Sequence, residues 1–143
     1  MIDDLYSQQI LKLTANIPRI GRLDAPQGSA DKIAKLCGSR IHVDLCLDGD
    51  RVTDYAHEVK ACALGQAAAS ILASHIIGAK VSEITEAREA LHAMLKKGAP
   101  PPGGRFIDLA VLAPIKDYPQ RHASTCLAFD ATVAAIEGAQ ARL

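Results

Sequence analysis

The sequence predicts an α+β fold in which a small antiparallel sheet precedes a set of helices. The first observation is that residues 41–48 alternate between apolar and polar side chains, the period of a half-buried strand. The second is the pair Asp48-Gly49, typical of a hairpin turn because both central positions of a type I′ turn need positive φ. The third is a series of apolar stripes at helical spacing after residue 62.

The first half of the chain supplies the sheet and one helix. Residues 3–17 carry apolar side chains at helical spacing, and Pro18 ends that helix. The glycines and proline of segment 19–30 predict an irregular connection. Residues 51–60 return as the second strand of the hairpin, and a weaker pattern just before Cys37 indicates a third strand.

The second half is predicted to be helical. The expected helices are 63–77, 82–97, 106–112 and 124–141. Gly78 stops the first of them, and Ser82 and Ser124 are the predicted N-caps of the second and the last. The Pro/Gly-rich segment 98–104 fits neither helix nor strand and is expected to be a surface linker.

Composition restricts the classes of function. The 143 residues fit a single domain, 1–143, and 16 basic residues balance 16 acidic ones. This neutral charge argues against partners such as nucleic acid or an anionic membrane, which both attract clustered Lys and Arg. No apolar run reaches the length of a bilayer span, and the acidic start Met1-Ile2-Asp3-Asp4 is unlike a signal peptide. We therefore expect a soluble cytoplasmic protein.

Two of the four cysteines are candidates for a site. With Asp48 and Gly49 as the hairpin loop, Cys37 is expected opposite Lys60, and Cys62 one diagonal step beyond, roughly 7–8 Å away. Both are then expected on the core-facing side of the sheet. Cys62 also precedes a helix, whose N-terminus favours a thiolate. The pair is either a metal- or sulfur-handling site or two small buried apolar residues.

The other candidate residues carry weaker signals. Cys46 is expected next to the turn on the polar face, without a function, and Cys126 shares a helical face with apolar residues, which favours a core thiol. His122 precedes the last helix. No paired ligand spacing recruits the remaining histidines, which are expected to face solvent: His42, His57, His75 and His92. No nucleotide-binding glycine motif or GxSxG sequence is present, so nucleotide binding and α/β-hydrolase chemistry have no support.

The order of these features resembles one known family. The relevant segments are Ile17-Pro18-Arg19-Ile20-Gly21, Leu36-Cys37-Gly38-Ser39 and Ala61-Cys62-Ala63 with its small-residue helix, and Leu127-Ala128-Phe129-Asp130-Ala131. They resemble the U-type iron–sulfur cluster scaffolds (IscU, SufU and the NifU N-terminal domain) over nearly the whole chain. The resemblance implies a three-stranded antiparallel sheet packed on one side by about five helices, the SufE/NifU-like fold.

The resemblance also implies a ligand set from which this chain departs. Family members use three cysteines and an aspartate for a cluster or zinc. Here Ser39 stands at the aspartate position, and a gapless alignment places Ser124 at the third cysteine. Cys126 is two positions further, roughly 200° around the helix, and should point away. The site is thus reduced to Cys37 and Cys62. His122 is the best spare ligand, and Ser124 and Cys126 are weaker candidates for metal binding.

The function implied is a scaffold or accessory protein of iron–sulfur cluster assembly without catalytic turnover. It would carry iron, sulfur or a cluster transiently through Cys37 and Cys62 and dock a cysteine desulfurase. Two alternatives stay open: an interaction or regulatory protein that keeps the fold without metal chemistry, and a zinc-dependent sulfur acceptor of the SufU type. Because two thiolates do not close a tetrahedral site, the expected cofactor, an iron–sulfur cluster or zinc, is bound weakly or not at all in the isolated protein.

Overall fold

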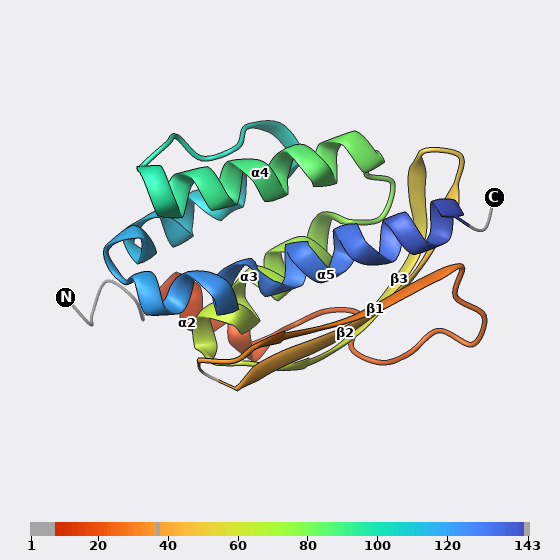
Figure 1. The fold of residues 1–143 in the computed structure, drawn as a ribbon, viewed down its shortest axis with the longest axis horizontal. Coiled ribbons are helices and arrows are strands. Elements are labelled where there is room, and N and C mark those ends of the chain that lie inside the picture. Colours follow the sequence, from red (N-terminus) through yellow and green to blue (C-terminus); the bar gives the residue numbers. More distant parts are fainter. Residues whose placement is uncertain (1–7, 37, 142–143) are drawn as a thin grey trace.

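The computed structural model describes residues 8–36 and 38–141, and it confirms the α+β prediction. The elements in this part of the chain are α2 (Gln8–Ala15), β1 (Gly28–Ala34), β2 (Ser39–Asp48), β3 (Arg51–Lys60), α3 (Ala63–His75), α4 (Val81–Lys97), the 3₁₀ helices η1 (Gly104–Asp117) and η2 (Pro119–Arg121), and α5 (His122–Ala141). The strands form one antiparallel sheet in the order β1-β2-β3, with the long helices on one face (Figure 1). No helix in the described ranges is both long and apolar enough to cross a bilayer.

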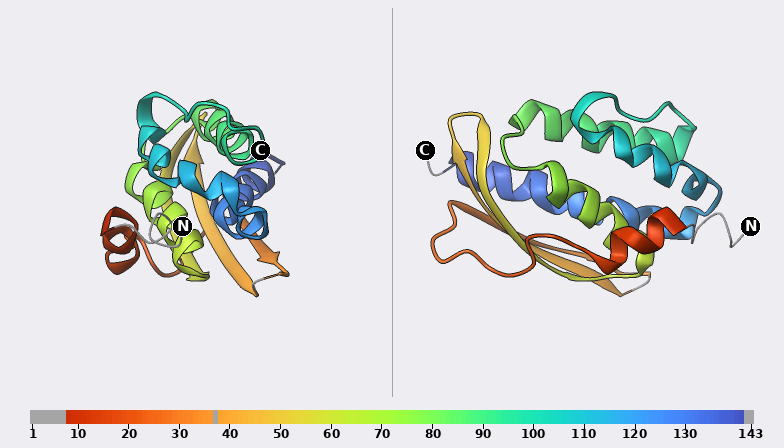
Figure 2. Two further views of the ribbon diagram at one scale, coloured as in Figure 1. Left: turned by 90° about the vertical axis from the view of Figure 1, so that its left-hand side faces the viewer. Right: turned by 180° about the vertical axis from the view of Figure 1, so that it is seen from behind.

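The helices form two layers over the sheet. Helix α5 packs along β1 and β2, α3 lies between α5 and β3, and α4 and η1 lie on the far side from the sheet (Figures 1 and 2). Gly28 allows β1 to touch α5, since an added Cβ would collide with the backbone carbonyl oxygen of Ala135. In the core, the rings of Phe106 and Phe129 meet edge to face with centroids 5.6 Å apart.

The hairpin strands occur where they were predicted, but their register is different. Leu47 lies opposite Val52 rather than Asp50, and a bulge then shifts the pairing so that Lys60 lies opposite Arg40. The predicted pairing of Cys37 with Lys60 is therefore wrong, while Cys37 itself lies outside the described residues. The bulge inserts one residue into β3 and reverses which of its residues face the core, a change that apolar alternation does not reveal.

Several element boundaries also differ from the predictions. Strand β1 begins at Gly28, inside the segment that was predicted to be irregular. Helix α4 has Lys80 as its N-cap rather than Ser82, because the Glu83 carboxylate accepts the Lys80 N–H at 2.9 Å. Helix α5 starts at His122, so Ser124 lies within its first turn and is not the cap. Of the helix predicted over 3–17, the described part is α2; the short helix predicted over 106–112 is a longer 3₁₀ helix, η1.

The connection from α2 to β1 is attached to the edge of β3. The backbone N–H of Gly21 donates to the His57 carbonyl at 2.9 Å, and the His57 N–H donates to the Arg19 carbonyl at 3.1 Å. The His57 ring is 0% exposed, and its Nε2 donates to the Pro18 carbonyl at 2.8 Å. The prediction that His57 faces solvent is wrong, because this connection covers the strand edge.

A buried carboxylate then holds the same connection across the outer face of the sheet. Asp44 is 0% exposed. Its oxygens accept from Arg22 Nε at 2.8 Å, the Leu23 N–H at 3.1 Å, Ser29 Oγ at 2.6 Å and His42 Nε2 at 2.7 Å. Burial raises the pKa of this carboxyl, but the hydrogen bonds outweigh it and hold the pKa well below its ordinary value.

Replacing Asp44→Asn should destabilise the fold in a pH-dependent way. A neutral amide cannot accept four hydrogen bonds, so we expect the free energy of unfolding to fall by about 3 kcal/mol at pH 7. The carboxylate has a lowered pKa in the folded state, so its contribution is present above the unfolded-state pKa of about 4 and is lost as the pH falls below it. Urea unfolding at pH 7, 5 and 3 should show that the free energies of unfolding of the variant and the wild type come closer together only below about pH 4.

The exposed Asp24→Asn on the same connection is the control and should change stability little at any of these pH values. A difference for Asp44→Asn that stays constant down to pH 3 would contradict this role of the carboxylate.

Candidate functional site

Cys62 occupies the junction between the sheet and the first helix behind it. It is the N-cap of α3, with extended backbone angles φ −65° and ψ 169°, as its predicted place before a helix requires. Its carbonyl accepts the Gln66 N–H at 2.9 Å, and the Gln66 side chain fixes the preceding residue by donating to the Ala61 carbonyl at 2.7 Å. The side chain of Cys62 is half-buried at the edge of the core.

Two buried serines meet Cys62 from distant parts of the sequence. The Cys62 N–H donates to Ser39 Oγ at 3.4 Å, and Cys62 Sγ lies 3.2 Å from Ser124 Oγ. Ser39 is 2% exposed and Ser124 is 1% exposed. The start of β2, the N-terminus of α3 and the first turn of α5 therefore converge on one residue, Cys62. The role of Ser124 as a metal ligand stays a prediction.

A glycine in α3 makes this convergence sterically possible. A Cβ at Gly65 would lie 3.0 Å from the Ser124 carbonyl oxygen and 2.9 Å from the Ala61 Cβ. Without a side chain at this position, α3 can approach α5 closely enough for Ser124 to reach Cys62. Gly65 was not among the predicted site residues, although a glycine inside an alanine-rich helix indicates a packing requirement.

The other two cysteines in the described part of the chain lie away from Cys62. Cys126 is 1% exposed and packs in the core, as its helical position predicted. Burial, reinforced by the nearby Asp130 carboxylate, raises the pKa of its thiol to about 12, so it is protonated at neutral pH. Cys46 is half-buried on the outer face of the sheet, where its thiol donates to the Ala25 carbonyl at 3.5 Å.

The described residues do not offer the ligands of a complete metal site. His122 Nε2 donates to the Ile115 carbonyl at 2.9 Å, so its ring is engaged with the last turn of η1. Within the described residues, no group of three or more His, Cys, Asp or Glu side chains is placed to hold a metal ion. Two neutral hydroxyls of the described residues contact Cys62, and hydroxyls are poor ligands for zinc or iron compared with thiolate, imidazole or carboxylate.

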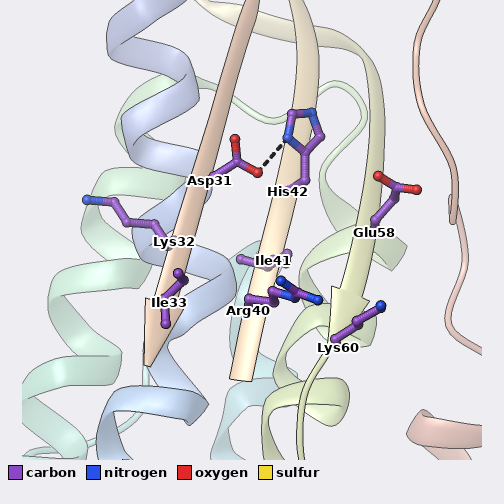
Figure 3. Close-up of a pocket in the computed structure, with 8 residues that line it drawn as sticks. All are labelled: Asp31, Lys32, Ile33, Arg40, Ile41, His42, Glu58 and Lys60. Carbon is purple, nitrogen blue, oxygen red and sulfur yellow. Dashed lines mark hydrogen bonds and ion pairs between the residues drawn. The ribbon is translucent and has the colours of Figure 1, made fainter. Parts of the chain in front are cut away.

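The outer face of the sheet is hollowed next to this site. A depression of about 500 Å³ lies at the strand ends that lead to Ser39 and Cys62. Figure 3 shows the residues that line it. One cross-strand row of this surface consists of Ile33, Arg40 and Lys60, and the neighbouring row consists of Asp31, His42 and Glu58.

The two rows differ in how their charges are partnered. In the second row, Asp31 accepts from His42 Nδ1 at 2.9 Å. In the first row, Arg40 and Lys60 face each other across the two strands, and neither forms an ion pair with a described carboxylate. Beside them Ile33 is 65% exposed. This cationic and apolar row was not predicted from the sequence.

Comparisons with known proteins agree with this architecture. A family model described as the NifU-like N terminal domain matches residues 5–125. The iron–sulfur cluster assembly scaffold protein IscU of Thermotoga maritima is 29% identical over 117 residues, which cover 82% of each chain.

Two solved structures are also similar. The crystal structure of a nitrogen-fixing NifU-like protein (N-terminal) from Brucella abortus superposes with a TM-score of 0.97 at 46% identity over 99% of both chains. A protein from Fervidobacterium islandicum, described as an iron–sulfur cluster assembly scaffold for the SUF system, has a TM-score of 0.82 at 22% identity. That match covers 94% of this chain and 98% of the other, and it shows a shared fold.

Proposed function

The chain belongs to the family of NifU-like N-terminal domains, and on that basis we propose that it is a scaffold or accessory protein of iron–sulfur cluster assembly. The observation that supports the proposal is the convergence of Ser39 and Ser124 on Cys62, within the region that the family model matches. The protein acts by holding cargo and has no catalytic turnover of its own. Its place is the reducing cytoplasm, where free thiols persist.

The cargo is sulfur, iron or a nascent cluster held at Cys37 and Cys62. Sulfur arrives as the outer atom of a persulfide on a cysteine desulfurase. The Cys62 thiolate attacks that atom, a new S–S bond forms, and the bond to the desulfurase cysteine breaks, which releases that cysteine as a thiolate. The exchange needs no external oxidant, because one sulfur–sulfur bond replaces another.

The row of Ile33, Arg40 and Lys60 is the proposed docking surface for the desulfurase. Lys60 is two residues before Cys62, and Arg40 follows Ser39, so any protein that delivers sulfur to Cys62 must approach this row. Like charges directly opposite each other destabilise a sheet, and a partner's acidic residues would relieve that repulsion. An exposed isoleucine beside the two cations gives such an interface an apolar centre.

The second candidate function is an interaction or regulatory protein that retains the fold without carrying cargo. The hydroxyls of Ser39 and Ser124 favour this second function, because they are weak metal ligands beside Cys62. A zinc-dependent sulfur acceptor is a third candidate, which requires ligands beyond the described ones.

Cysteine substitutions separate these functions. Cys62→Ser should abolish uptake of sulfur from a cysteine desulfurase supplied with cysteine, and Cys37→Ser should reduce it, both measured as the mass of one added sulfur atom after anaerobic alkylation. Cys46→Ser and Cys126→Ala should keep it, because neither thiol lies at the site. Folded wild-type protein that neither binds the desulfurase nor takes up sulfur or metal would reject the scaffold proposal. Loss with Cys126→Ala and retention with Cys37→Ser would reject the site.

Charge reversal tests the docking surface. Arg40→Glu and Lys60→Glu should each weaken desulfurase binding on the order of tenfold, mainly through slower association, and the effect should diminish at high salt. The matched control is Lys96→Glu on α4, which lies on the side of the molecule away from the sheet (Figure 1). Equal binding by Lys60→Glu and Lys96→Glu, measured by surface plasmon resonance, would show that the partner docks elsewhere.

A further inference from the structure

We propose that Ser124, together with Ser39, adapts Cys62 to carry sulfane sulfur as a persulfide and disfavours a tightly held metal ion. The inference rests on the proposed function in so far as the sulfur serves cluster assembly. It goes further by naming the residues that favour a persulfide on Cys62 over a bound metal ion.

The Ser124 hydroxyl has two partners and a single hydrogen. Its oxygen lies 3.2 Å from Cys62 Sγ and 3.4 Å from the Arg121 carbonyl oxygen. When Cys62 is a neutral thiol, the S–H donates to Ser124 Oγ and the hydroxyl donates to the carbonyl. When Cys62 is a thiolate, the hydroxyl rotates and donates to Sγ instead, and in the persulfide it donates to the outer sulfur, which is bonded to Sγ and carries the charge. The hydrogen bond then becomes charge-assisted and stronger.

The second hydroxyl fixes the backbone that carries the thiol. Ser39 Oγ accepts the Cys62 N–H at 3.4 Å, which anchors the N-cap residue to the start of β2. Both serines are almost fully buried, so each hydroxyl is held in place rather than exchanging freely with solvent. Cys62 itself is half-buried, which leaves a path for an incoming sulfur atom.

The same donors are unsuited to a metal ion. Zinc and iron in proteins take thiolate, imidazole or carboxylate ligands, which present an ionised or lone-pair atom to the metal. A serine hydroxyl keeps its proton at neutral pH and competes poorly with water for such a metal. A persulfide requires only one covalent bond, to Cys62, and hydrogen-bond donors around its charge.

The first experiment loads the protein with sulfur without any desulfurase. Reduced protein is treated anaerobically with inorganic polysulfide: the Cys62 thiolate attacks a sulfane sulfur, one S–S bond of the polysulfide breaks, and the shortened polysulfide leaves with the electron pair. The lifetime of the Cys62 persulfide is then measured against a fixed concentration of glutathione by mass spectrometry of alkylated peptides.

Ser124→Ala should shorten this lifetime about tenfold, the scale of one charge-assisted hydrogen bond. Ser39→Ala should shorten it less, since that hydroxyl contacts the backbone and not the sulfur. The matched control is Thr125→Ala, which removes a hydroxyl in the same turn. That hydroxyl donates to the Arg121 carbonyl oxygen at 2.8 Å and does not contact Cys62. Equal lifetimes for Ser124→Ala and Thr125→Ala would overturn the proposal.

The second experiment reverses the selectivity. The double variant Ser39→Asp/Ser124→Cys places a carboxylate and a second thiolate at the two atoms that face Cys62. We expect it to retain about one zinc ion per chain against a competing chelator that strips the wild type. Wild-type protein that retains one zinc ion per chain under the same conditions would overturn the inference and leave the scaffold function intact. Failure to bind a desulfurase would reject the proposed function without changing the polysulfide result.

Discussion

The close approach of α3 to α5 at Gly65 is the constraint on which the cysteine site depends. Glycine weakens a helix interior by about 1 kcal/mol relative to alanine, yet here it lies in a helix otherwise rich in alanine. An alanine would place its Cβ 3.0 Å from the Ser124 carbonyl oxygen, and the first turn of α5 would have to shift by a few tenths of an ångström to relieve the contact. Gly65 therefore lowers the helix propensity of α3 but allows the contact between Ser124 and Cys62 that defines the chemistry of the site.

The two faces of the sheet differ in what they contact. The inner face is committed to packing against α5 and α3, which fixes Ser39, Cys62 and Ser124 relative to one another. On the outer face, the Asp44 network holds the α2–β1 connection over one part of the sheet. This connection does not cover the part of the outer face near Cys62, so the charged and apolar side chains there are accessible to a partner (Figure 3).

Local sequence signals predicted much of this fold. Alternation and a turn located the hairpin, and helical spacing placed Cys126 in the core. The register could not be predicted, because the bulge that pairs Lys60 with Arg40 has no counterpart in the apolar pattern. The burial of His57 could not be predicted either, because the α2–β1 connection that covers it is distant in the sequence. At the site, resemblance indicated Ser39 and Ser124 as departures, and only the folded chain shows that both touch Cys62.

The packing at Gly65 maintains the hydroxyl environment of Cys62, and a pair of glycine substitutions tests this dependence. Gly138→Ala is the reference, because its Cβ would have 4.0 Å to the nearest atom and alanine favours the helix. The measurement is the lifetime of a polysulfide-derived Cys62 persulfide in the two folded variants. This dependence predicts a shortened lifetime for Gly65→Ala, similar to that of Ser124→Ala, and a wild-type lifetime for Gly138→Ala. A wild-type lifetime in folded Gly65→Ala would contradict it.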